Sequence, residues 1–213
     1  MVTKFNCPSC GAENSFKSAL SLFAVCPFCQ ASVFRGEGEI ELLGKVSELA
    51  DDNSPLQLGS TGQFNDIRFT IVGRVRKKWK DGFWNEWHLL LADGQSGWLA
   101  EAQGEFYFTK EIKKSVSNFS NKKWFLKDDV NIDDQRYIVV DLKSSQVFMA
   151  EGELPYRAHA GDQFESADLR QVAGNQFGTL ERDMRGDNHR IYLGFIVKIA
   201  DLKLSSVRKF DGW

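Results

Sequence analysis

Two pairs of cysteines near the N-terminus constrain this chain most strongly. The pairs are Cys7-Pro8-Ser9-Cys10 and Cys26-Pro27-Phe28-Cys29, and they contain all four cysteines of the 213 residues. A two-residue gap lets both thiolates of a pair bind one ion, and four thiolates form the closed tetrahedral site typical of structural zinc. We therefore predict a zinc ribbon over residues 1–35 that holds one structural zinc ion, with Cys7, Cys10, Cys26 and Cys29 as the ligands.

Two other uses of the cysteines stay open at this stage, a redox dithiol pair and an iron–sulfur centre. A redox Cys-x-x-Cys usually begins a helix in a βαβ setting, which this sequence pattern lacks. Gly11 follows the first pair and is expected to take the left-handed step of the knuckle, while Gln30 occupies the same place in the second pair. Since no cysteine remains for disulfides elsewhere, the chain fits a reducing compartment, and we expect a cytoplasmic protein.

The stretch from Leu58 to Thr109 predicts a compact β-meander. It contains four of the six tryptophans, and Asp81-Gly82 and Asp93-Gly94 separate runs rich in Val, Ile, Phe and Trp. Asp-Gly pairs tolerate the positive φ angles that tight hairpins need. Phe69, Ile71 and Val75 are expected to share one face of the strand before the first turn. We assign residues 58–127 to a first antiparallel β lobe, barrel- or sandwich-like.

A second lobe of the same kind is expected over residues 128–213, where alternating apolar residues resume. An acidic connector, residues 36–57, precedes the first lobe, and its few apolar residues are expected to dock on the β body. The strands expected in the second lobe are Tyr137–Leu142, Gln146–Ala150, Gln163–Val172, Gln176–Glu181 and Arg190–Ile199, with Lys143-Ser144-Ser145 as a turn between the first two. The predicted fold class is therefore mostly β: a zinc ribbon followed by two small antiparallel β lobes.

The formal charge of −2 gives no general reason to expect a nucleic acid as partner, but the charge is unevenly distributed. Residues 36–58 hold one lysine against six acids, and residues 110–127 hold six lysines against one acid. The basic segment includes Lys122, Lys123 and Trp124, which could bind single-stranded nucleic acid through phosphates and stacked bases. The alternative is that Trp124 fills the β body while the lysines stay in water. No apolar run approaches the length of a membrane span.

A candidate interaction surface follows from the alternation of the two longest meander strands. It would carry Arg74, Arg76 and Lys78 across from Trp84, Glu86 and His88. Aromatic rings beside arginines can grip a peptide or stack on a base. The alternative is an ordinary solvated sheet with cross-strand pairs. His88 and Glu86 have no Ser or Cys nucleophile near them in the sequence, so we predict no catalytic residues.

Several segments together resemble a known bacterial family. They are Phe69–Val75, Trp84-Asn85-Glu86-Trp87, Asp93-Gly94, Gly97–Gly104, Glu151–Pro155 and Tyr192-Leu193-Gly194. With the preceding cysteine pairs, they resemble the bacterial domain-of-unknown-function family 4178, in which a Tyr is expected where this chain has His88. The resemblance implies a cytoplasmic bacterial accessory protein linked to membrane-stress or polyamine-synthase-like systems, and it brings no catalytic residues.

The function expected from these observations is a non-enzymatic adapter that binds a protein partner and contains a structural zinc site. The expectation combines a closed metal site, an aromatic and basic sheet surface, and the lack of a recognisable catalytic set in the sequence. Two alternatives remain, a nucleic-acid-binding protein that uses the basic aromatic segment and an enzyme of unknown class.

Overall fold

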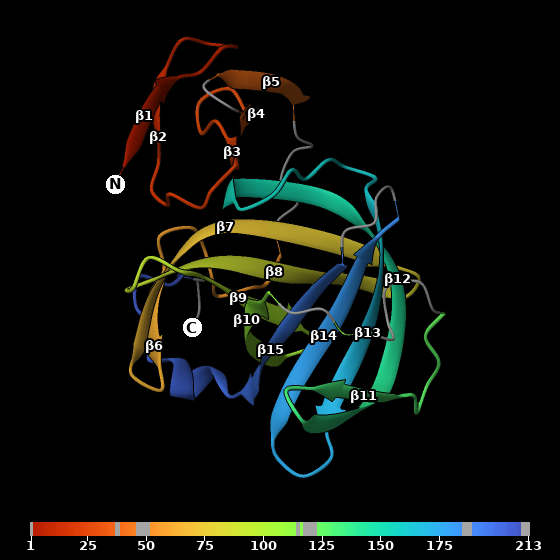
Figure 1. Cartoon of the computed structure of the whole chain (residues 1–213). Coiled ribbons are helices and arrows are strands. Elements are labelled where there is room, and N and C mark those ends of the chain that lie inside the picture. Colours follow the sequence, from red (N-terminus) through yellow and green to blue (C-terminus); the bar gives the residue numbers. More distant parts are fainter. Residues whose placement is uncertain are drawn as a thin grey trace.

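The computed structural model describes residues 2–36, 39–45, 52–113, 116, 123–184 and 189–209. Within these ranges the chain forms fifteen strands and one short 3-10 helix (Figure 1). Their bounds are β1 Thr3–Asn6, β2 Glu13–Phe16, β3 Phe23–Val25, β4 Ala31–Arg35, β5 Ile40–Lys45, β6 Thr61–Phe64, β7 Ile67–Trp79, β8 Gly82–Leu91, β9 Ser96–Ala102, β10 Glu105–Ile112, β11 Asp129–Ile132, β12 Gln135–Leu154, β13 Gln163–Gln171, β14 Gln176–Asp183, β15 His189–Val197 and η1 Ile199–Leu202. In the part of the chain covered here, no helix has the length and apolar character needed to cross a membrane.

Eight strands close into a ring in which every pairing is antiparallel. The order around the ring is β7, β8, β9, β10, β15, β14, β13 and β12, and β12 then pairs with β7. Closure leaves these eight strands without a free edge, which is the way a barrel avoids edge-to-edge association. The expectation of a mostly β, antiparallel fold is confirmed, and Figure 1 shows the strands wrapping around a common axis.

The two predicted lobes supply the two halves of this ring. Strands β7 to β10 come from residues 58–127, and strands β12 to β15 come from residues 128–213. The halves join at two seams, β10 against β15 and β7 against β12. The boundaries themselves, at 1–35, 36–57, 58–127 and 128–213, stay a prediction.

Strand β12 is long enough to take part in four pairings, the first of them between its start and β11. Its first half pairs with β13, its second half with β7, and its end with β3. The turn predicted at Lys143–Ser145 is wrong, because Ser144 pairs with Glu165 inside the strand. Instead, β12 changes direction through register shifts between Val139 and Asp141 and between Val147 and Met149. Such bulges increase local twist and let one strand bend around a barrel.

A register shift in β7 decides which side chains point into the barrel. Ile71 pairs with Leu89, whereas Gly73 pairs with His88, so one residue of β7 is left over between them. The alternation of β7 therefore reverses at Val72. The predicted shared face is wrong in part, because Val75 lies on the face opposite to Phe69 and Ile71.

The outer face of β7 to β10 is covered by segments from both ends of the barrel domain. Phe69, Ile71 and Trp87 belong to a buried cluster that also includes Leu56 from the connector and Leu202 from η1. The expectation that apolar residues of the connector dock on the β body is thus met at Leu56, which is fully buried. The connector residues 37, 38 and 46–51 lie outside the described residues.

One end of the barrel interior is filled by apolar side chains and closed by the N-terminal unit, the name used here for strands β1 to β5. Phe23 of β3 belongs to the same buried cluster as Val75, Trp98 and Leu154. Strand β3 also continues the sheet by pairing with the end of β12. The N-terminal unit therefore sits as a cap over one end of the barrel (Figure 1).

Candidate metal centre

The two cysteine pairs form knuckles with matching backbone geometry. In the first, the Gly11 amide donates to the Cys7 carbonyl at 2.8 Å, and in the second, the Gln30 amide donates to the Cys26 carbonyl at 2.9 Å. Gly11 has φ +74° and Gln30 has φ +58°, so both take the predicted left-handed step. Glycine adopts this conformation without strain, whereas glutamine does so at some cost.

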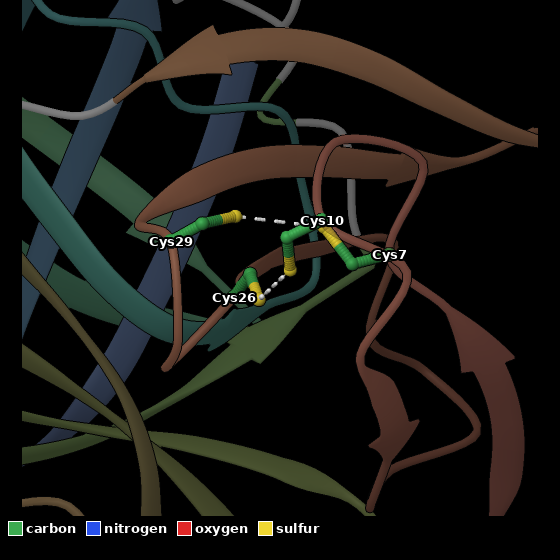
Figure 2. Close-up of side chains that lie close together, drawn as sticks. All are labelled: Cys7, Cys10, Cys26 and Cys29. Carbon is green, nitrogen blue, oxygen red and sulfur yellow. Dashed lines mark hydrogen bonds between the residues drawn. The ribbon is translucent and has the colours of Figure 1, made fainter.

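The knuckles bring the four sulfurs together, as Figure 2 shows. The Cys7 and Cys29 sulfurs lie 3.7 Å apart, those of Cys10 and Cys26 lie 3.8 Å apart, and all four are within 4.8 Å of one another. A tetrahedral ion with Zn–S bonds of about 2.3 Å has S–S edges of about 3.8 Å. None of the four forms a disulfide. The cluster is thus able to hold a metal ion.

Nearby donors favour the thiolate form that a metal needs at two of the four cysteines, Cys26 and Cys29. Burial alone would raise the pKa of the Cys26 thiol, but hydrogen bonds from the Cys29 and Phe28 backbone and from the Asn14 amide lower this pKa to about 6. The Asn14 amide lies 3.5 Å from the Cys26 sulfur. A hydrogen bond from the Ala31 backbone likewise lowers the pKa of Cys29. These groups also orient the sulfurs, as partners of metal ligands commonly do.

A buried carboxylate joins the N-terminal unit to the barrel, in addition to the β3–β12 pairing. Glu153, near the end of β12, accepts hydrogen bonds from the Lys17 amide at 2.9 Å and from the Ser18 amide at 3.2 Å. Glu153 is only 5% exposed. A carboxylate that accepts backbone N–H groups forms charge-assisted bonds, which are stronger than neutral ones. The sequence offered no signal for this contact, because its partners lie far apart along the chain.

The candidate interaction surface is divided between the two faces of the sheet. Arg74 pairs with Trp87 rather than with a residue of the predicted aromatic row, and it is only 2% exposed. Its guanidinium lies 2.8 Å from Asp52, 2.7 Å from Glu151 and 4.7 Å from the centre of the Trp87 ring. The assumption that Arg74 faces solvent is therefore wrong, and Arg74 instead fastens the connector to the outer wall of the barrel.

Arg76 and Lys78 remain partly open to solvent near the first hairpin. Both cations lie over the Phe83 ring, at 5.0 and 5.8 Å from its centre. Arg76 also lies 3.8 Å from Asp52. These two side chains therefore agree with the alternative for this surface, an ordinary solvated sheet with cross-strand pairs.

His88 is fully buried and has a partner at each ring nitrogen. Nδ1 lies 2.8 Å from the Glu153 carbonyl and Nε2 lies 2.9 Å from the Ser96 hydroxyl. A carbonyl only accepts, so the proton is assigned to Nδ1, and the hydroxyl then donates to Nε2. Burial lowers the pKa of His88 to about 4, so the ring is neutral at pH 7. The two ring nitrogens of His88 thus tie β8 to the end of β12 and to β9.

Trp84 and Glu86 point into the barrel, where they meet a lysine that the sequence patterns did not single out. Lys77 is 1% exposed and lies 3.0 Å from Glu86 and in direct contact with Glu181. Burial alone would lower the pKa of Lys77, but Glu181 and Glu86 together raise it. Burial in turn raises the pKa of Glu86. Lys77 was overlooked because the bulge at Val72, which turns it inward, leaves no mark in the alternation.

In the described part of the basic segment, the Trp124 ring is buried, while Phe125 is 52% exposed. Trp124 is 5% exposed, belongs to an apolar cluster over β12 to β15, and lies under the Arg182 guanidinium at 5.0 Å. Lys123 is exposed and lies 5.9 Å from the Phe125 ring. Lys122 lies outside the described residues. The burial of Trp124 agrees with the alternative in which this ring fills the β body.

The fold and the cysteine cluster define a class of protein, an all-β chain in which a unit able to hold a metal ion caps a closed barrel. The family model for a domain of unknown function, DUF4178, matches residues 57–197, and the chain belongs to that family. The match begins just before β6 and ends with β15, so the family domain coincides with the barrel, and the cysteine cluster precedes it. Neither the curated proteins nor the solved structures contain a match to this chain.

Proposed function

We propose that the protein is a non-enzymatic adapter in which one structural zinc ion folds the N-terminal unit as a zinc ribbon. The observation that carries the proposal is the set of four sulfurs within 4.8 Å of one another, with edges of 3.7 and 3.8 Å. Four thiolates leave no open position on the ion, which favours a structural role over a catalytic one. Such a small unit also buries too little apolar surface to fold firmly without a metal.

The partner surface we assign to this adapter lies on the N-terminal unit. Its second knuckle presents Phe28 with 71% of the residue exposed, and Leu20 and Leu42 are each 48% exposed. These three apolar side chains are the ones we assign to the contact with the partner. The family resemblance extends the proposal to a bacterial accessory protein of the cytoplasm, in a membrane-stress or polyamine-linked assembly, and four free cysteines support a reducing compartment.

Metal analysis of freshly purified protein tests the zinc assignment. We expect one zinc per chain, released when Cys26→Ser removes one ligand, and no iron absorption bands. Less than stoichiometric zinc in wild-type protein, or iron in its place, would refute the assignment. The matched control is Ser9→Ala, which lies between two ligands but offers no thiolate.

Affinity purification from the native host tests the adapter role separately. We expect a stoichiometric protein partner that is lost with Phe28→Ser and retained with Val172→Ser, a control that alters an exposed apolar residue of a barrel turn. If the Phe28 variant retains the partner, the partner binds at another surface of the protein. The lack of any stable partner would refute the adapter role while leaving the zinc assignment intact.

A further inference from the structure

The half of the barrel interior that lies away from the N-terminal unit is hollow. The cavity has a volume of about 320 Å³, and its walls come from β7, β8, β9, β10, β12, β13 and β14. Ligand pockets of proteins typically measure about 300 to 1,000 Å³. The apolar cluster around Trp98 and Phe23 fills the other half, so the cavity is closed at that end.

The strand register confirms that the wall residues share the inner face. Tyr107 pairs with Ala100, Thr179 pairs with Asp168, and Asp168 also pairs with Asp141. Paired residues on neighbouring antiparallel strands project to the same side of a sheet. The side chains of five different strands therefore converge on one space.

The cavity is strongly acidic. Five carboxylates line it against one lysine, Lys143; they are Glu86, Glu105, Asp141, Asp168 and Glu181. Three cations pair with these carboxylates. Lys143 lies 3.0 Å from Asp168 and contacts Asp141. Lys77 contacts Glu86 and Glu181, and Arg190 lies 3.6 Å from Glu181. The carboxylates outnumber these cations, so the interior keeps a negative potential, which a closed wall of low dielectric strengthens.

Aromatic rings form the rest of the wall. Trp84 donates from its indole nitrogen to Glu86 at 3.0 Å, which holds the ring in place, and the Tyr107 and Phe177 rings pack with their centres 4.6 Å apart. Elsewhere the protein places its own cations over rings, as Arg74 does over Trp87. Among the described residues, no lysine or arginine lies over the rings of Trp84, Tyr107 or Phe177.

We propose that the barrel interior binds a small organic ammonium ion, with its charged group among the carboxylates and its carbon skeleton against the aromatic wall. Carboxylates exclude anions, and ring faces attract cations that have shed their water. A bare metal ion would leave most of this volume and all of the rings unused, so an organic cation fits the site better. The inference does not depend on the adapter role or on zinc.

Isothermal titration calorimetry on the full-length, zinc-loaded protein tests the proposal. The probes are 1,4-diaminobutane and tyramine, a linear and an aromatic amine, and the control is 1,4-butanediol, which has the same length as the diamine but no charge. We expect at least one amine to bind, with an affinity that falls as salt is raised. If neither amine binds at millimolar concentration, or if the diol binds as well as the diamine, the proposal fails.

Three variants locate the binding. Ala100→Trp fills the cavity and should abolish binding, Asp141→Asn should weaken it about tenfold, and Trp84→Leu should weaken it about threefold to thirtyfold. The matched control is Asp201→Asn, which neutralises an exposed carboxylate of η1 outside the barrel and should change nothing. Circular dichroism checks folding, and if Ala100→Trp does not fold, the other two variants decide. Unchanged binding in both of them would place the amine outside the cavity and overturn the inference.

Discussion

Arg74 shows how much one side chain can contribute when its charge is buried with its partners. It contacts Asp52 and Glu151, which are themselves largely buried, and it covers the Trp87 ring. Replacing Arg74 with Met keeps most of the volume but removes the cation that contacts Glu151 and lies nearest to Asp52. Removing one member of a buried pair typically costs about 3 to 5 kcal/mol. We therefore expect Arg74→Met to lower the free energy of unfolding by about that amount, measured by urea denaturation followed by tryptophan fluorescence.

Arg68→Met is the matched control for this experiment. Arg68 lies on the same strand but is exposed, and surface substitutions usually change stability by no more than about 0.5 kcal/mol. If the free energy of unfolding falls by the same small amount in both variants, then Arg74 does not fasten the connector. That result would support the predicted solvent-facing surface.

His88 makes the stability of the protein sensitive to mild acid. Burial lowers its pKa from 6.5 to about 4, so the unfolded chain takes up a proton at a pH where the folded chain does not. The neutral, buried His88 ring adds its full contribution to the free energy of unfolding above pH 6.5. This contribution, about 3 kcal/mol, is lost as the pH falls toward 4. We expect His88→Gln, whose amide can bond both neighbours, to flatten the dependence of unfolding free energy on pH between 7 and 5. His159→Gln is the control, and an unchanged slope in the His88 variant would contradict this account.

At the scale of elements, Glu153 is one of the contacts that attach the N-terminal unit, beside the β3–β12 pairing and the Arg157–Glu41 ion pair. Glu153→Ala would leave the Lys17 and Ser18 amides without their acceptor, at a cost of about 1 to 3 kcal/mol. We expect faster hydrogen exchange and proteolysis within β1 to β5, while the barrel strands keep their protection. Glu13→Ala, which breaks only an exposed pair with Lys4, should leave the exchange unchanged. Equal exchange in both variants would show that the attachment lies elsewhere.

The elements differ in how far the sequence could predict them. The knuckles could be predicted, including the left-handed Gln30, because metal-ligand spacing acts over a few residues. The inward face of β7 could not, because the extra residue at Val72 reverses the alternation without interrupting the apolar pattern. Consequently, Lys77 and the acidic cavity were overlooked, and Arg74 was assigned to the wrong environment.

At the scale of the molecule, the closure of two lobes into one ring could not be predicted, since its seams join residues far apart in the chain. Each seam nevertheless has a glycine at a point where two backbones come close together. A Cβ at Gly73 would lie 1.9 Å from the Glu153 carbonyl oxygen, and one at Gly194 would lie 1.9 Å from that of Phe108. Both glycines fall within segments that carry the family resemblance. Glycine in a strand often marks such a close backbone approach, but the sequence alone does not say to what.

Gly73 therefore provides a test of the closed ring. In Gly73→Ala the new methyl group meets a backbone oxygen that cannot rotate away, so the β7–β12 seam must separate, at a cost of about 1 to 3 kcal/mol. We expect a lower urea midpoint and a joint loss of amide protection in β7 and β12. Gly36→Ala is the control, because its Cβ would lie 3.7 Å from the nearest atom, the Glu39 carbonyl oxygen. If Gly73→Ala unfolds at the wild-type midpoint with both strands protected, the two halves are not closed on each other at this seam, and the enclosed cavity loses its wall.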